Sequence, residues 1–416
     1  MTLLGDRVWL ARDIKAVAGA AQDARFSIEK RVLQKKVEVA ADALGWGQYL
    51  DEVHHSDDQW GLLGTSAGYQ VLARAHVEGG SIPELDHARA LLPGDVSDIT
   101  ALHPAVQTKA APPKSDLANI VRLAAIAEAL SADQPGGSAG LAHPPLVDHI
   151  LSLAHHGQCW NPRSAQPDGK NLDGHAVTTA YVLHAIRRYE TDRAQFRPVR
   201  AWLARQLLND ATLRARPDYL ALIGLALTAP SADTADHSDV RQAIDRCREE
   251  LLAWRKRERN LVLNRPLFEG YQLGTSTDYL IFNPEIMAAL FFLRSDNPRP
   301  ARRFVALVTH EVSRNVQSNA GFQGQLGMIP TVDQEWASRL LHEFAAIYND
   351  KTRRHLLLPG RLTSPLVRWG LVVAAVAVLT GVLIAAGVDF KTGVLVFVAG
   401  AILAVVLVIV GERGDD

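Results

Sequence analysis

The sequence predicts an all-α fold, an (α/α)6 toroid of six helix pairs followed by a C-terminal transmembrane helical hairpin. Three observations lead to this prediction. Apolar residues before position 359 recur at helical spacing, and long alternating strand patterns are absent. Strongly apolar helical segments alternate with amphipathic, charged segments six times along the chain. Two stretches of 20 residues without a charge then follow, at 369–388 and 392–411.

Six apolar segments are expected to form an inner ring, because helices that are apolar nearly all round are typical of buried positions. An aspartate stands at or shortly before each segment, and successive aspartates are 45 to 60 residues apart, which indicates an internal repeat. The segments are residues 66–75, 116–130, 173–189, 218–229, 278–293 and 332–348. The aspartates are Asp58, Asp116, Asp173, Asp218, Asp278 and Asp333.

Six charged segments between them are expected to form an outer ring. Prolines fall near the starts of three of these helices, where a missing N–H costs least. A period of this length also fits an open solenoid of helix pairs. Closure into a toroid is favoured because the inner segments are too apolar for a one-sided stack. The charged segments are residues 31–44, 84–92, 144–156, 196–208, 238–257 and 299–315.

The C-terminal region predicts a membrane anchor. Each uncharged stretch is long enough to cross ~30 Å of hydrocarbon as a helix, and only three residues separate the two. Lysines and arginines crowd residues 351–368, so the positive-inside rule places the N-terminal domain and the C-terminus in the cytoplasm of a cell-membrane protein. The hairpin would contact the lipid bilayer through residues 369–411, and its glycines and alanines could pack copies into a homo-oligomer.

These features divide the chain into five parts. They are an N-terminal helical segment (1–30), the toroid (31–350), a basic juxtamembrane linker (351–368), the transmembrane hairpin (369–411) and a cytoplasmic tail (412–416). Because 44 basic residues balance 45 acidic ones, the net charge of -1 gives no indication of nucleic-acid binding. The N-terminus lacks the apolar core of a secretory signal. Cys159 and Cys247 offer neither a disulfide framework nor a CxxC pair.

The loops that precede the inner segments share an aromatic residue, glycines and then Ser, Thr or Asp at the start of a helix. Examples are QWGLLGTSAGYQVL at 59–72 and GYQLGTSTDYLIF at 270–282. Over roughly residues 30–350 this pattern resembles the α/α-toroid superfamily of terpene cyclases, squalene-type cyclases and protein prenyltransferase β subunits. The resemblance implies a helical toroid whose inner helices all start at one end of a central cavity.

The catalytic motifs of that superfamily are degenerate in this sequence. In the loop and helix GFQGQLGMIPTVDQEW, Asp333 stands where prenyltransferases have a zinc-binding Asp, but Glu335 occupies the place of their Cys. A carboxylate cannot replace a zinc-bound thiolate nucleophile, so prenyl transfer is disfavoured. Asp245, Cys247 and His310 copy the family's metal spacing but lie in charged segments expected to be outside the ring. No metal and no other cofactor is therefore expected.

The predicted ligand site is the end of the toroid at which the inner helices start. Carboxylates and aromatic side chains would gather there, and that combination suits a small cationic or sugar-like molecule or a peptide. Aspartates at helix starts also stabilise the helix by capping, and one role does not exclude the other. The predicted site comprises Asp58, Trp60, Trp160, Asp173, His175, Tyr271, Asp278, Phe322, Asp333 and Glu335.

Three functions remain open from the sequence. The first is a membrane-tethered sensor or scaffold that passes its ligand state to the hairpin, as in membrane effectors of bacterial defence systems. The second is a membrane-associated enzyme, similar to terpene cyclases or prenyltransferases, that acts on an isoprenoid or lipid-linked substrate with a carboxylate pair such as Asp333 and Glu335 as acid and base. The third is a toroid that only docks another protein.

Overall fold

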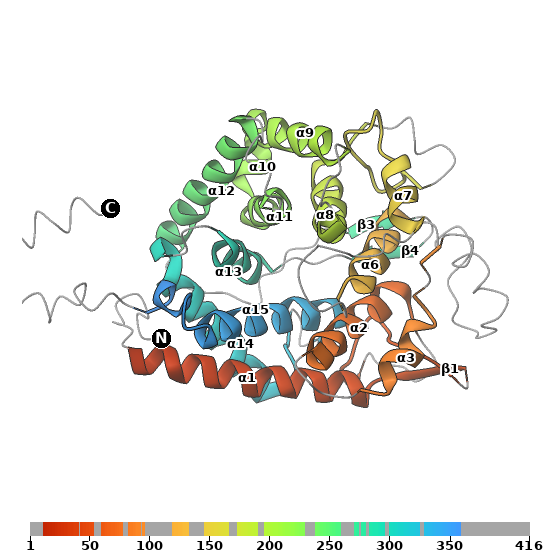
Figure 1. Ribbon diagram of the computed structural model, residues 1–416, viewed down its shortest axis with the longest axis vertical. Coiled ribbons are helices and arrows are strands. Elements are labelled where there is room, and N and C mark those ends of the chain that lie inside the picture. The colour runs from red at the N-terminus through yellow and green to blue at the C-terminus, as the bar shows by residue number, and fades with distance from the viewer. Residues whose placement is uncertain are drawn as a thin grey trace, which may run out of the picture. The chain divides into compact units, whose positions relative to one another are not determined.

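The structure is a computed structural model of the 416-residue chain, and its described part is mostly helical (Figure 1). This confirms the predicted all-α class. The chain divides into two units, Met1–Val8 with Asp13–Leu357, and Trp9–Arg12 with Leu358–Asp416. The structure describes residues 11–40, 42–53, 60–77, 82–92, 94–95, 119–132, 145–165, 173–189, 195–228, 238–258, 270–273, 276–279, 283–295, 299–324 and 328–358.

Six helices of the first unit form a closed circuit of contacts (Figure 1). Each packs against the next one along the chain, and the last packs against the first. Nearly all their residues are buried, including every residue of the second helix of the circuit. These inner helices are α2 (Leu62–Val77), α6 (Ile120–Leu130), α8 (Ala176–Ile186), α11 (Pro217–Leu227), α13 (Pro284–Arg294) and α15 (Thr331–Asn349).

A second set of helices packs on the inner ones, and each buries a single face. Helix α12 (Ser238–Arg257) shows the pattern, because its buried residues Val240, Ala243, Cys247, Leu251 and Trp254 recur every three or four positions. It packs against α11. The same arrangement joins α3 (Glu84–Arg89) to α2, α7 (Pro145–Ser152) to α6, α9 (Phe196–Asn209) to α8, and α14 (Arg302–Asn319) to α13 and α15.

The remaining described elements are short, apart from α1 (Ala11–Gln34). Two antiparallel pairs of strands occur, β1 (Val37–Ala40) with β2 (Ala43–Gly45) and β3 (Gly270–Leu273) with β4 (Ser276–Tyr279). The other pieces are α10 (Ala211–Ala215), η3 (Arg187–Tyr189), η4 (Arg299–Ala301) and η6 (Arg354–Leu356).

The predicted start of the fifth inner segment is wrong. Residues 276–279 form strand β4, and helix α13 begins only at Pro284. The Asn283 side chain accepts a hydrogen bond from the Ile286 N–H at 3.0 Å. An asparagine N-cap followed by proline at the first helical position is a strong start signal. The helix therefore begins at this signal and not at Asp278.

A repeated local geometry fixes the N-terminal ends of inner helices, where aromatic side chains fill the space. The Trp160 N–H donates to Thr179 Oγ1 (3.0 Å), and the Thr179 hydroxyl donates back to the Trp160 carbonyl (3.0 Å). Trp46 and Thr65 are separated by the same 19 residues, and the Trp46 N–H donates to Thr65 Oγ1 at 3.2 Å. Gly68 permits this packing, because a Cβ there would lie 2.5 Å from the Trp46 ring.

The predicted transmembrane spans, 369–388 and 392–411, lie outside the described residues. Within the described ranges, no helix combines the length and the apolar character that crossing a membrane requires.

Candidate functional site

Three of the predicted aromatic residues of the site are part of the core. Trp60, Trp160 and Phe322 are all buried, at 7%, 0% and 1% exposure. The backbone of Phe322 is held on both sides by the Gln334 amide, which accepts from its N–H (2.6 Å) and donates to its carbonyl (2.7 Å). These three rings therefore pack inside the protein and do not present faces on which a ligand from solvent could stack.

The other predicted residues belong to different elements. His175 caps α8, where its Nδ1 accepts from the Thr178 N–H at 3.2 Å, while Asp173 is exposed two residues earlier. Tyr271 and Asp278 face each other in the backbone register of β3 and β4. Asp58 lies outside the described residues.

Asp333 and Glu335 are both buried in α15 but have different surroundings. Burial alone raises the pKa of Asp333 to about 7. Its Oδ2 lies so close to Gly324 that a Cβ there would be 2.8 Å away. Burial also opposes ionisation of Glu335, but the charges of Arg339 and Arg74 outweigh it and lower the pKa of that carboxyl. The two carboxyls therefore differ in protonation, and Glu335 is engaged by the guanidinium groups of Arg74 and Arg339.

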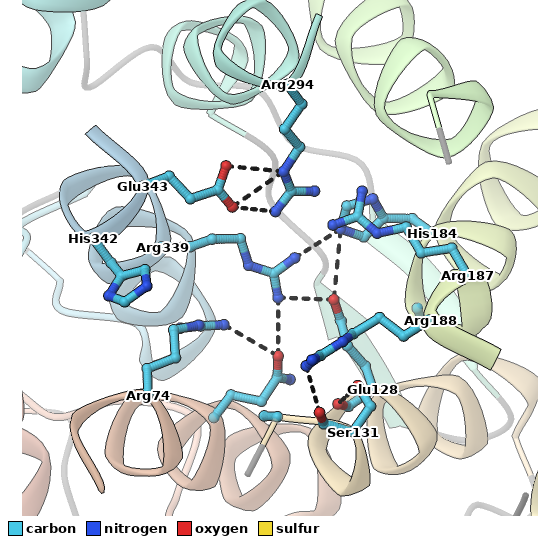
Figure 2. A pocket seen from close by; sticks show the side chains of 13 residues that line it. Arg74, Glu128, Ser131, His184, Arg187, Arg188, Arg294, Arg339, His342 and Glu343 are labelled. Atoms are coloured by element: carbon cyan, nitrogen blue, oxygen red, sulfur yellow. Dashed lines mark hydrogen bonds and ion pairs between the residues drawn. The ribbon is translucent and has the colours of Figure 1, made fainter. Parts of the chain in front are cut away.

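A cavity of about 330 Å³ lies among the inner helices, towards their C-terminal ends (Figure 2). Five of the six inner helices line it, and α8 continues into the wall through η3. The lining is unusually rich in arginine. It consists of Gln70, Arg74, Glu128, Ser131, Ala132, His184, Ala185, Arg187, Arg188, Arg294, Arg339, His342 and Glu343.

Arg339 is the centre of this wall and connects four inner helices (Figure 2). Its Nη2 donates to Glu128 Oε1 on α6 (2.8 Å) and to Gln70 Oε1 on α2 (2.9 Å). Its Nε donates to Glu335 Oε1 on its own helix at 2.8 Å. Burial opposes the charge, but the two glutamates raise the pKa of Arg339 above its ordinary value. A guanidinium that is only 4% exposed is thus kept ionised by paired carboxylates.

The fourth contact of Arg339 defines the protonation state of His184 on α8. Arg339 Nη1 and His184 Nε2 are 2.7 Å apart. A guanidinium can only donate, so Nε2 must accept and the imidazole must be neutral. Burial, followed by the charges of Arg187 and Arg339, lowers the pKa of His184 well below its usual range, which agrees with this assignment.

The residues around Arg339 share one position along their helices. Gln70, Glu128, His184 and Arg339 are each the ninth residue of an inner helix. The ninth residues of α11 and α13 are Leu225 and Phe292, which are apolar. The prediction from the helix starts missed this recurrence of a polar residue at one position of four inner helices.

Two further contacts close the wall. Arg294 and Glu343 form a two-pronged ion pair between α13 and α15, with Nε 3.1 Å from Oε1 and 2.9 Å from Oε2. Burial opposes the charge of Glu343, but Arg294 lowers its pKa. Arg187 donates to the Leu225 carbonyl of α11 at 3.4 Å, which is long for a hydrogen bond. Burial and then the charges of Arg294 and Arg339 lower the pKa of Arg187 well below its usual range.

The wall has more positive than negative charges, and it has more hydrogen-bond donors than its own acceptors can pair. The lining contains five arginines and two glutamates, and Glu335 behind it adds a third carboxylate. Arg74 Nη1 and Arg294 Nη1 are buried and have no hydrogen-bond partner in the described part of the chain. Because buried polar atoms are normally paired, two unpaired guanidinium nitrogens at one cavity need an explanation.

The alternative metal site suggested by Asp245, Cys247 and His310 does not assemble. The Cys247 thiol is fully buried on one side of α12, whereas the Asp245 carboxylate is half-exposed and pairs with Arg248 at 2.7 Å. His310 on α14 lies 3.3 Å from its neighbour Glu311. Within the described ranges, no group of three His, Cys, Asp or Glu residues is arranged to hold a metal ion.

No family model, curated protein or solved structure matches this chain. Function is therefore inferred from the geometry of the arginine-lined cavity.

Proposed function

We propose that the chain is a membrane-tethered binding protein that captures a small anionic molecule inside a helical toroid. One observation carries the proposal: five arginines surround a cavity of about 330 Å³, and two of their buried nitrogens lack an acceptor among the described residues. A volume of this size fits a small molecule, since ligand pockets range from roughly 300 to 1,000 Å³.

The (α/α)6 toroid is part of this proposal. The closed circuit of six inner helices, with outer helices packed on them, supports it. The resemblance to the α/α-toroid superfamily then concerns the fold and not the chemistry, because the residues that would bind zinc or protonate an alkene are replaced or missing. The uncharged stretches at 369–388 and 392–411 support a tether that leaves the binding domain in the cytoplasm.

The cavity favours an anion over the cationic, sugar-like or peptide ligands expected from the helix starts. Guanidinium groups are donors only, and they bind carboxylate and phosphate oxygens through paired N–H bonds. The aromatic residues that would have stacked on a cation are buried in the core. The binding end of the toroid is therefore the end at which the inner helices finish.

Helix capping is the plainest alternative explanation for these arginines. Basic residues are favourable at the negative C-terminal end of a helix. Arg188 donates to the Ser131 carbonyl at the end of α6, and Arg187 donates to a carbonyl in the last turn of α11. Arg74 and Arg294 also lie in the last turns of α2 and α13, but this position does not account for the buried nitrogen that each retains with no acceptor among the described residues.

Binding of anions to the full chain in detergent micelles tests the proposal. We expect thermal stability to rise with millimolar phosphate, sulfate or small carboxylates, and to be unchanged by matched cations. The double variant Arg294→Gln with Glu343→Gln removes both charges of one ion pair and should abolish the response. Arg205→Gln, on the exposed face of α9, is the matched control. No stabilisation by any anion would contradict the proposal.

An enzyme is the second candidate, favoured by Asp333 alone. A carboxyl with a pKa of about 7 has the acidity that general acid–base catalysis requires. However, Asp333 is not among the residues that line the cavity. We therefore place binding ahead of catalysis. Turnover of an isoprenoid or lipid-linked substrate that Asp333→Asn abolishes would reverse this order.

A further inference from the structure

We infer that the ligand is a phosphomonoester, and that its phosphoryl group is bound between Arg74, Arg187 and Arg294. The inference rests on the proposed function and names the chemical class of the ligand. It follows from three properties of the cavity: the directions from which unused donors approach, the excess charge, and the size.

The arginine donors come from three different elements. Arg74 approaches from α2, Arg187 from η3 at the end of α8, and Arg294 from α13 (Figure 2). Arg74 and Arg294 each have a buried Nη1 that meets no acceptor in the described ranges, and Arg187 spends one long bond on a carbonyl. A carboxylate offers two oxygens in one plane. A phosphomonoester offers three terminal oxygens that point in three directions, and it therefore suits donors from three sides.

The excess charge corresponds to a dianion. Five arginines and three glutamates leave two positive charges when His184 and His342 are neutral. A phosphomonoester has a charge of about −1.5 to −2 at pH 7, whereas a monocarboxylate has only one negative charge. Arg187 is buried, and the positive charges of Arg294 and Arg339 act on it as well. A dianion in this place would remove that repulsion.

The size of the cavity excludes large phosphorylated partners. About 330 Å³ holds a phosphoryl group and a small organic part, not a protein segment or a nucleic-acid strand. Polar side chains of the same wall, such as Gln70 and His342, are available to the organic part. A small phosphorylated metabolite is therefore the class that agrees with volume, charge and donor geometry together.

The test is calorimetric titration of the full chain in an uncharged detergent, with phenyl phosphate, inorganic phosphate, sulfate and benzoate as probes at pH 7.5 and pH 5. We expect phenyl phosphate to bind most tightly. Its affinity should fall about tenfold at pH 5, because the second pKa of a phosphomonoester is about 6. Sulfate remains a dianion at both values, so it reports any titration of His184, His342 or the cavity glutamates.

Variants locate the site. Arg187→Gln should weaken phenyl phosphate binding at least tenfold, Arg187→Lys should recover part of the loss, and the exposed control Arg205→Gln should have no effect. Circular dichroism of each variant separates loss of binding from loss of fold.

The outcomes distinguish the two proposals. Benzoate that binds as tightly as phenyl phosphate would refute the dianion and leave an anion-binding protein. Equal affinity for inorganic and phenyl phosphate would show that free phosphate is the ligand and overturn the ester. If none of the four probes binds, both the ligand class and the proposed function fail.

Discussion

The two ends of the inner helices differ in what occupies the space between them. At the N-terminal ends, the fourth residue of a helix locks an aromatic segment in place, as Thr65, Thr179 and Gln334 do. At the ninth residue of the same helices the side chains are Gln70, His184 and Arg339, which line a cavity. Five residues, or ~7.5 Å along a helix, separate a packed core from a charged wall.

The difference explains why the charged end keeps a cavity in the described part of the chain. Aromatic rings can be buried without loss once their backbone groups are paired, so the N-terminal end closes on itself. Arginines cannot approach one another in the same way, because like charges in a buried site repel and lose their solvation. The charged end therefore keeps a space that carboxylates fill in part and that an anion can complete.

The largest predicted effect is from Arg339→Met, at the charged end. The change leaves Glu128 and Glu335 buried without their common partner and removes the contacts of residue 339 with Gln70 on α2, Glu128 on α6 and His184 on α8. Removing one partner of a buried ion pair typically costs about 3–5 kcal/mol in free energy of unfolding. Denaturant unfolding measures the loss. Adding Glu128→Gln should restore part of the stability, and an equal loss in single and double variants would argue against the charge network.

The next effect concerns pH and the packed end. The pKa of Asp333, about 7, lies above the ordinary value of ~3.9, so the folded protein binds this proton more tightly than the unfolded chain does. Stability from this group is present at pH 4 and is lost as pH rises through 7. Asp333→Asn should therefore raise the free energy of unfolding at pH 8 by roughly 2–4 kcal/mol and change it little near pH 4.

Unfolding curves for parent and variant between pH 5 and pH 8 check this prediction. If the difference between the two proteins does not depend on pH, Asp333 does not titrate in this range.

The smallest predicted effect separates the two ends directly. Thr179→Val keeps the shape of the side chain but removes both hydrogen bonds to the Trp160 backbone, at a cost of about 1–3 kcal/mol. Phosphate binding, measured below the melting temperature, should change less than twofold because Thr179 does not line the cavity. A tenfold loss of affinity with the fold intact would show that the two ends are not independent.

The sequence predicts the helices well where local signals decide them. Apolar periodicity locates the inner segments, and Asn283 with Pro284 would have placed the start of α13 correctly had the cap been given priority over Asp278. The predicted site followed the helix starts, and the structure shows that Trp60, Trp160 and Phe322 of that site are core. An aromatic residue of the core and an aromatic residue of a ligand site fit the same apolar pattern, so periodicity could not distinguish them.

The cavity could be predicted only in part. Polar residues such as Glu128 and His184 stand out in strongly apolar helices, but their shared ninth position appears only when the helix starts of the structure are known. Their contacts with one another could not be predicted, because they depend on the packing of helices that are distant in the sequence. Arg74 and Glu335 pair across 261 residues, and Arg339 and Gln70 across 269. No local pattern fixes contacts of this range, which exist only after α15 has packed against α2.

Arg339 belongs to the last inner helix of the chain, and this order matters during synthesis. The glutamate, glutamine and histidine that surround it leave the ribosome earlier, on α6, α2 and α8. Until residue 339 emerges, these helices expose an apolar surface with polar groups that lack Arg339 as a partner. A nascent chain that stops before α15 is thus a natural target for chaperones and proteases, and completion of translation becomes the step that commits the protein to its native state.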